Sequence, residues 1–238
     1  NIAAGIVSLG EFGLLFALPL WLQNVLGYTA FDTGLILLSL AIGSFLASGA
    51  GATIGARKGP IFIVRLGIML EIIGIAAAGV VVSTSTSWWL IAIPLFFYGA
   101  GVGLATAQLT GVALADVPVQ MSGQGSGIQS TTRQLGSAFG IAILGTVLFS
   151  SLGNDFNARL EAFPQLPAAV KTQLSETVVK SAGSVIPAFR ADPQQQAVGD
   201  AAAEALTYGT KLSAFIGAFF LVLGWLASLR LGKSVPRE

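Results

Sequence analysis

Apolar residues in this chain gather into six long windows that are separated by polar segments. The windows cover residues 3–24, 33–55, 61–82, 88–115, 125–149 and 211–231. A helix that crosses a lipid bilayer needs about 20 mostly apolar residues, and each window meets that length. The pattern therefore predicts an all-α membrane protein with six transmembrane helices.

Short polar turns join the first windows, as expected for antiparallel neighbouring helices. In the turn at 27–32, we expect Asp32 or Thr33 to cap the second helix, since both side chains can accept a backbone N–H bond. Gly59 and Pro60 end the second helix and begin the third, because proline is favoured in a first helical turn.

Basic residues lie on one side of the predicted bundle. They are Arg57, Lys58 and Arg65 beside the second turn, and Arg230, Lys233 and Arg237 after the last window. The turns on the other side carry no Lys or Arg, so the positive-inside rule places the basic side in the cytoplasm. We therefore expect an integral protein of a bacterial-type plasma (inner) membrane, with both ends of the chain cytoplasmic.

The segment 150–210 is too polar to span and is expected outside the cytoplasm. Within it, residues 168–182 and 194–208 have helical spacing with modest apolar faces, which predicts short amphipathic helices on the membrane surface or over the bundle. The alternative is a mobile linker. The predicted organisation is thus helices one to five in 1–149, a long extracytoplasmic loop in 150–210, the last span in 211–231 and a cytoplasmic tail in 232–238.

Composition supports a membrane protein and excludes several functions. Hydrophobic residues make up 54% of the chain and charged residues 10%, against about 25% charged in soluble domains. A net charge of +1 gives no reason to expect a nucleic-acid partner. Because the chain has no cysteine and no histidine, we expect no disulfide, no zinc site and no cofactor. Asn1 already enters an apolar run, so the chain is interpreted as a fragment of a longer protein.

The most informative window, 123–149, combines glycines with a charge. On a helix Gln129, Arg133, Gly136 and Gly140 fall on a single face. The small-xxx-small spacing of Gly136 and Gly140, and of Gly123 and Gly127, predicts close approach by another helix. An arginine at membrane depth costs about 2.5–3.5 kcal/mol on insertion scales, so Arg133 is expected to face protein or water.

Three runs of residues together resemble one known family. They are Gly123-x-Gly125-Ser126-Gly127 followed by Thr132-Arg133-Gln134-Leu135-Gly136, the run Tyr98 to Gly103, and the run Leu18 to Gly27. The chain resembles the carboxyl-terminal half of the 14-span drug:proton antiporters of the major facilitator superfamily. The resemblance implies a bundle of two inverted three-helix repeats, and a partner in the amino-terminal half of the same transporter. Gly99 and Gly103 are expected to pack helices, as Gly136 and Gly140 are.

The resemblance also brings expectations for the turn between the second and third helices. The family usually has an acid before the arginine of this turn, and Ala56 stands there in this chain. Arg57, Lys58 and Gly59 keep the rest of the cytoplasmic loop motif. Without that acid, the resemblance does not imply a contact between loop and helix at this position.

Charged and amide residues inside the windows are the candidates for chemistry. Glu11 lies about halfway along a helix that the resemblance places beside a cavity, and a carboxylate buried at that depth can exchange protons. Arg133 either extends to the cytoplasmic interface or pairs with a carboxylate or an anionic group. Gln108 and Gln129 either line the cavity or join helices by hydrogen bonds. Glu71 lies in a helix that the family places at the periphery, which favours a structural hydrogen bond or a lipid-headgroup contact.

Aromatic residues are the last group of candidates. Phe12 and Phe16, one turn apart beside Glu11, could contribute stacking and cation–π contacts to a pocket for lipophilic cations. The wider aromatic set is Phe12, Phe16, Trp21, Phe96, Phe97 and Tyr98. The alternative for all of them is a place in the core or against lipid.

The predicted function is proton-coupled efflux of amphipathic drugs or other lipophilic compounds by a secondary active transporter. Its partners would be membrane lipids, protons and a small lipophilic substrate, and no enzyme activity is expected. One alternative is a dedicated lipid or metabolite exporter of the same fold. Another is a non-transporting membrane scaffold, although a scaffold has no use for a costly acid such as Glu11 inside the membrane.

Overall fold

The computed structural model describes residues 2–114 and 117–229, and all regular structure in these ranges is helical. The elements are α1 (Ile2–Asn24), α2 (Ala30–Lys58), α3 (Pro60–Val81), α4 (Trp88–Leu114), the 3₁₀ turn η1 (Val119–Met121), α5 (Ser122–Leu160), α6 (Ala168–Lys180), α7 (Ile186–Ala191) and α8 (Gln196–Ser228). Within the described ranges, six helices are long and apolar enough to cross a membrane: α1 to α5 and α8. The predicted fold class is confirmed. The predicted tail, 232–238, lies outside the described residues.

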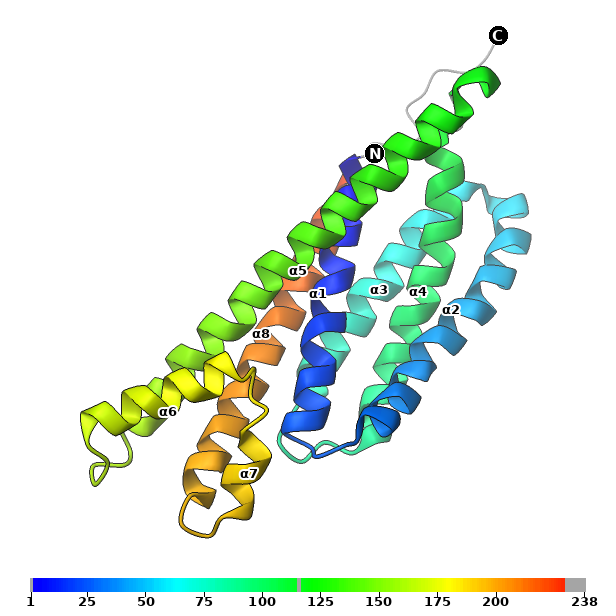
Figure 1. Ribbon diagram of the computed structural model, residues 1–238. Helices are drawn as coiled ribbons and strands as arrows, with labels where there is room; N and C mark the ends of the chain where they lie inside the picture. Colours follow the sequence, from blue (N-terminus) through cyan, green and yellow to red (C-terminus); the bar gives the residue numbers. More distant parts are fainter. Residues whose placement is uncertain (1, 115–116, 230–238) are drawn as a thin grey trace.

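The six long helices form two triplets that pack into one bundle (Figure 1). The first triplet is α1 to α3, and the second is α4, α5 and α8. Packing is most extensive in the pairs α3/α4, α2/α4, α1/α5 and α1/α8. In the two triplets α1 corresponds to α4, α2 to α5 and α3 to α8. When each helix is replaced by its counterpart, the pair α1/α5 becomes α4/α2 and the pair α3/α4 becomes α8/α1. This exchange of partners is what two inverted three-helix repeats require.

The helix ends sort into two groups along the bundle. In Figure 1 the α1–α2 and α3–α4 turns lie at the same end as α6 and α7, and the start of α1 and the α2–α3 turn lie at the other end. Arg65 near the start of α3 donates to the carbonyl of Ser228 at 3.2 Å, which places the end of α8 at that second end as well. The basic turn and the segment with α6 and α7 therefore lie on opposite sides.

The last two spanning helices are longer than predicted. The prediction ended the fifth helix at 149 and began the last at 211, whereas α5 runs to Leu160 and α8 begins at Gln196. Hydropathy marks only the part of a helix that crosses lipid. Beyond that part, a helix continues as long as one of its faces carries apolar residues that pack against other helices. Leu152, Phe156 and Leu160 are such a stripe, four residues apart and fully buried.

The predicted loop 150–210 is correspondingly shorter and is itself ordered into helices. α6 lies within the first predicted amphipathic segment, 168–182, whereas the second, 194–208, is the beginning of α8 and no separate helix. The segment packs on the end of α1: the Asn24 amide donates to the Ala182 carbonyl at 3.0 Å, and the Arg190 guanidinium donates to the Val25 carbonyl at 2.8 Å. These contacts favour a cap over the bundle and not a mobile linker.

Two turns show how the sequence begins its helices. Thr29 is the N-cap of α2 and forms a capping box with Asp32, so the predicted cap, Asp32 or Thr33, lies about one turn too late; Thr33 is buried inside the helix. Between α2 and α3, Gly59 has a φ of 88°, a conformation that glycine adopts without strain. Pro60 then begins α3, as predicted. Lys58 lies 5.0 Å above the ring of Phe62, a cation–π contact beside this turn.

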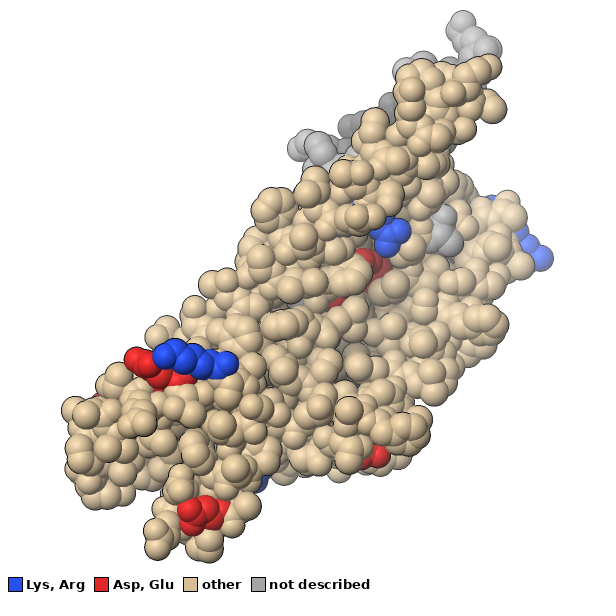
Figure 2. Space-filling view, viewed as in Figure 1, with Lys and Arg blue, Asp and Glu red and all other residues tan. Residues whose placement is uncertain are grey.

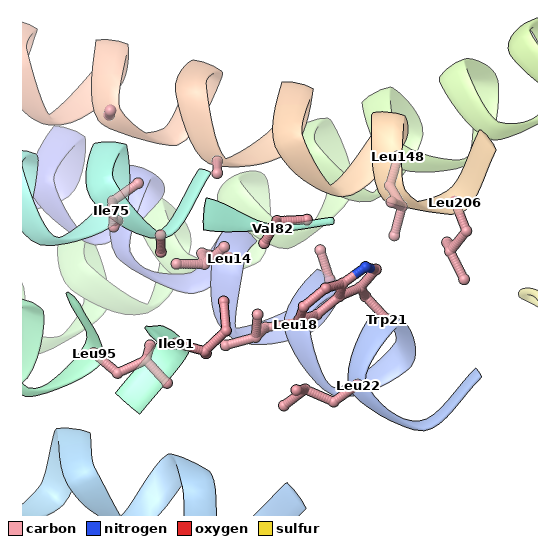
Figure 3. Packing of buried hydrophobic residues seen from close by; sticks show 14 of the residues in the cluster. Leu14, Leu18, Trp21, Leu22, Ile75, Val82, Ile91, Leu95, Leu148 and Leu206 are labelled. Atoms are coloured by element: carbon pink, nitrogen blue, oxygen red, sulfur yellow. The ribbon is translucent and has the colours of Figure 1, made fainter. Parts of the chain in front are cut away.

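Part of the apolar core lies where α1 packs against α3, α4 and α8 (Figure 3). Leu14, Leu18 and Leu22 of α1 pack with Ile75 of α3 and Ile91 of α4, and all five are fully buried. Trp21 turns toward α8 instead, where its indole N–H donates to the Thr207 hydroxyl at 3.1 Å. This part of the bundle is therefore closed by side chains.

Glycines bring two pairs of helices into backbone contact. A Cβ added to Gly136 or Gly140 of α5 would meet the carbonyl oxygens of Gly5 and Leu9 of α1. In the other triplet, a Cβ added to Gly99 or Gly103 of α4 would meet the carbonyl oxygens of Leu40 and Ser44 of α2. By contrast, Gly123 and Gly127 have open space beside them, so that second small-residue motif contacts no helix among the described residues.

A leucine at Gly140 should separate α5 from α1. Overpacking of this kind costs about 1–3 kcal/mol, so Gly140→Leu is expected to lower the apparent melting temperature and the yield of monodisperse protein. Gly127→Leu in the same helix is the matched control, because its neighbourhood is open. Thermal unfolding of the two purified variants makes the comparison, and equal stability would show that the Gly140 face is not packed.

Candidate functional site: a cavity with an acid and a base at membrane depth

A cavity of about 310 Å³ lies between α1, α2, α4 and α5, in the half of the bundle that the apolar core leaves open. The residues used below are Glu11 and Phe12 of α1, Ser44 and Ser48 of α2, Tyr98 of α4 and Arg133 of α5. The wall of the cavity is mostly apolar, and its polar side chains are Glu11, Ser44, Ser48, Tyr98, Thr106 and Arg133. Cavities of this composition bind small molecules.

Glu11 reaches the cavity because of how α1 is packed on either side of it. The preceding residue, Gly10, faces α8, where an added Cβ would be 2.8 Å from the Gly217 carbonyl. One residue further along, the helix turns by about 100°, which directs Glu11 away from α8. The Glu11 side chain lines the cavity, although only 4% of its surface is exposed.

Arg133 approaches the same cavity from α5. It lies one turn before Gly136, so the close packing of α5 on α1 holds it beside the acid-bearing helix. Arg133 interacts electrostatically with Glu11 and also with Glu71 of α3. Figure 2 shows a basic group next to an acidic group in the middle of a face that is otherwise nearly uncharged there. Arg133 lines the cavity together with Glu11, and both predictions for its function stay predictions.

Tyr98 connects the two glycine-packed helix pairs at the cavity. Its hydroxyl donates to the backbone carbonyl of Glu11 at 2.9 Å, and its side chain is fully buried. On the other side, a Cβ added to Gly74 of α3 would be 2.6 Å from the Tyr98 nitrogen. Tyr98 thus joins α4 to α1 and lies against α3.

A second hollow of about 370 Å³ meets the cavity at Phe12 and Arg133, which line both. Gln129 lines this hollow, is almost fully buried, and donates from its amide to the Thr110 hydroxyl of α4 at 3.1 Å. Gln129 therefore both faces a hollow and joins α5 to α4. Lining a cavity and joining helices, which the sequence left as alternatives, are thus combined at Gln129.

Other predicted site residues lie elsewhere. Phe16 stacks edge-on with Phe149 of α5, with ring centroids 6.0 Å apart, and does not line either hollow. Gln108 lies beside Gly55 of α2, where an added Cβ would be 3.5 Å from its amide nitrogen. Trp21 is in the apolar core, and Phe97 is about half exposed on the outside. Of the predicted aromatic pocket, the structure brings together Phe12 and Tyr98.

Glu71 makes neither of the two contacts that were expected for it. A lipid-headgroup contact is excluded because the side chain is fully buried, with 0% exposed. The expected structural hydrogen bond is also missing, since neither carboxylate oxygen has a partner among the described residues. The family resemblance placed this helix at the periphery, but α3 packs closely on α4 and turns Glu71 inward. Its Cγ would be 2.7 Å from a Cβ added to Gly101.

The sequence analysis missed the serines of α2. Leu40, Ser44 and Ser48 line the cavity at intervals of four residues. Ser48 donates to the Ser44 carbonyl at 2.7 Å and lies 3.3 Å from the Gly103 carbonyl, so it spans α2 and α4. The four-residue spacing was a readable signal, but serines inside an apolar window are also common where helices merely pack. Within the described residues, no three His, Cys, Asp or Glu side chains gather as metal ligands would.

Six spanning helices in two inverted triplets, around a cavity with an acid and a base at membrane depth, define part of a helical membrane transporter. The sequence profile of the Major Facilitator Superfamily matches residues 2–141, which is more than half of the chain. The chain belongs to the Major Facilitator Superfamily.

Relatives with curated names agree with this family. The chain is 33% identical over 192 residues to multidrug resistance protein Stp of Mycobacterium tuberculosis, an alignment that covers 76% of this chain and 34% of Stp. It is 34% identical over 163 residues to the probable actinorhodin transporter of Streptomyces coelicolor, covering 64% of the chain and 27% of that protein. A tetracycline resistance determinant of Streptomyces rimosus is 29% identical over 147 residues, covering 60% and 42%. The chain thus spans well under half the length of these relatives.

Removing the Tyr98 hydroxyl should weaken the link between α4 and α1. A net hydrogen bond contributes about 1 kcal/mol, so Tyr98→Phe is expected to lower the apparent melting temperature by about 2–4 °C. Tyr208→Phe, at a half-exposed position of α8, is the matched control. Thermal unfolding in detergent measures both, and a Tyr98→Phe protein as stable as the control would mean that this bond does not hold the helices together.

Proposed function

We propose that this chain is the carboxyl-terminal half of a 14-span efflux transporter that exchanges protons for amphipathic drugs or other lipophilic compounds. Its amino-terminal half would close the cavity from the other side. The observation that carries the proposal is the buried acid Glu11 in an otherwise apolar cavity. The driving force would be the proton gradient, and the chain needs no cofactor for this exchange.

Glu11 suits the exchange of a proton for a cation. A carboxylate in an apolar cavity is costly when ionised and unpaired, so it binds either a proton or a cationic group. Proton and cargo therefore compete for negative charge in the cavity. Phe12 is 36% exposed beside it and offers an aromatic face to an apolar or cationic cargo. The relatives named for multidrug and antibiotic resistance support a lipophilic cargo.

A dedicated metabolite exporter is the second candidate, and the names of two relatives favour it. One is the probable actinorhodin transporter, and another is the tetracenomycin C resistance and export protein of Streptomyces glaucescens. In a reconstituted assay a multidrug pump would move several unrelated lipophilic dyes. A dedicated exporter would move one metabolite class, and unrelated dyes would not compete with it.

Glu11→Gln tests the coupling acid in the full-length transporter that contains this chain. The amide mimics the neutral carboxyl in size, so the variant should fold, but it cannot release a proton. Proton-driven uptake of a lipophilic cationic dye into inverted vesicles should fall on the order of tenfold or more and lose its dependence on pH. Exchange of dye down its own gradient should continue.

Glu161→Gln provides the control for this experiment. Glu161 follows α5, is exposed, and approaches Lys171 at 3.7 Å outside the spanning region. Uptake by this variant should equal that of the unmodified protein. Unchanged rate and pH dependence in Glu11→Gln would remove Glu11 from the mechanism and with it the main support for proton-coupled antiport.

The proposed orientation places α6 outside and the α2–α3 turn in the cytoplasm. This chain contributes no cysteine of its own, so single cysteines can report the two sides. Gln173→Cys on the exposed face of α6 should react with an impermeant maleimide in intact cells, and Ala56→Cys at the exposed end of α2 should react only after permeabilisation. Labelling in the reverse pattern would invert the assignment.

A further inference from the structure

Glu71 has no function in the exchange described so far, although its position is costly. The carboxyl group is fully buried, and both oxygens lack a hydrogen-bond partner among the described residues. An ionised carboxylate in such a place would lack both water and hydrogen bonds, which costs far more free energy than burying a neutral group. α3 packs closely on α4 beside this group, since a Cβ added to Gly101 would be 2.7 Å from the Glu71 Cγ.

The groups that face Glu71 are few. Tyr98 of α4 lies against α3 at Gly74, and Glu11 of α1 and Arg133 of α5 interact electrostatically with Glu71. α8 also packs against α3. Ala214 of α8 meets Gly79, and the Ser228 carbonyl of α8 accepts a hydrogen bond from Arg65. The charged residues of α8 are Asp200, Glu204 and Lys211, and all of them precede Ala214. Ala214 meets α3 at Gly79, about two turns after Glu71, so these charges lie still further from Glu71. On α3 itself, Arg65 is turned to the end of α8.

The charge balance of this group is uneven. Two carboxyl groups, Glu11 and Glu71, lie near a single cation, Arg133. Arg133 can balance one carboxylate, and ionising both would leave a net negative charge in an apolar interior. Two interacting carboxyl groups that have one counter-charge between them share one proton. Glu11 lines the cavity and Glu71 is enclosed, so the proton is better placed on Glu71.

We propose that Glu71 is a second proton-binding carboxyl, and that it releases its proton when a cation enters the cavity beside Glu11. The cation supplies the second positive charge, which allows both carboxylates to be ionised. Glu11 is then the group that cargo meets, and Glu71 is the group that yields the proton. This inference rests on the proposed proton-coupled function and adds where the exchanged proton is held.

Proton release on binding tests the assignment directly. Tetraphenylphosphonium, a lipophilic cation, is added to the purified full-length transporter in weak buffer with a pH indicator. The unmodified protein should release about one proton for each cation bound. Glu71→Gln should bind the cation and release several-fold fewer protons, whereas Glu161→Gln should behave like the unmodified protein. Undiminished release by Glu71→Gln would overturn the proposal.

Infrared spectroscopy provides a second test that needs neither transport nor cargo. The C=O stretch of a neutral carboxylic acid is resolved from that of a carboxylate. The unmodified protein should show this band at neutral pH, and Glu71→Gln should lose it. If Glu71→Gln does not fold, titration of the band in the unmodified protein decides the question, since a band that is missing at neutral pH contradicts the proposal.

The two tests separate this inference from the proposed function. Failure of tetraphenylphosphonium to bind would count against a lipophilic cation as cargo, and the infrared band would still decide whether Glu71 holds a proton. Conversely, loss of proton-driven uptake in Glu11→Gln together with an unchanged infrared band in Glu71→Gln would support antiport and overturn the role of Glu71.

Discussion

Backbone contact between helices at glycines is the constraint on which the rest of this structure depends. In lipid there is little hydrophobic drive between helices, so close van der Waals packing must hold them together. Gly136 and Gly140 seat α5 on α1, and Gly99 and Gly103 seat α4 on α2. The cavity lies between these two pairs: α1 and α5 contribute its acid and its base, and α2 and α4 contribute its hydroxyl groups.

The cavity and the apolar core divide the bundle between them. Leu14, Leu18 and Leu22 of α1 fill the half near α6 and α7, and Glu11 lies just beyond them where the filling stops. Tyr98 spans the boundary through its bond to the Glu11 carbonyl. The cap formed by α6 and α7 adds polar bonds from Asn24 and Arg190 on the closed side. A bundle that is capped at the α6–α7 end and has a cavity in its other half suits alternating access, in which the cavity opens to one side of the membrane at a time.

The charges at membrane depth are few and close together, which makes each one consequential. Surface ion pairs such as Lys180–Glu176, with nitrogen and oxygen 2.7 Å apart, are exposed and contribute little to stability. The carboxyl groups of Glu11 and Glu71 are buried, so any change of charge near them changes the free energy of their protonation far more than it would in water. This sensitivity is the property that a proton-coupled transporter needs, and Arg133 is the residue that sets its balance.

The sequence by itself determined the six spans, the contacting glycines and the acid of the cavity, because length, hydropathy and four-residue spacing act locally along a helix. It did not determine where α5 and α8 end, since helices continue beyond the lipid as long as Leu152, Phe156 and Leu160 find partners. It also led us to expect a hydrogen bond or a lipid-headgroup contact for Glu71, and it overlooked Ser44 and Ser48. Which side of a helix faces the cavity depends on the rotation of that helix against its neighbours. That rotation is fixed by contacts between residues far apart in the chain, such as Glu71 with Gly101 and Tyr98 with Glu11, and only the tertiary structure decides them.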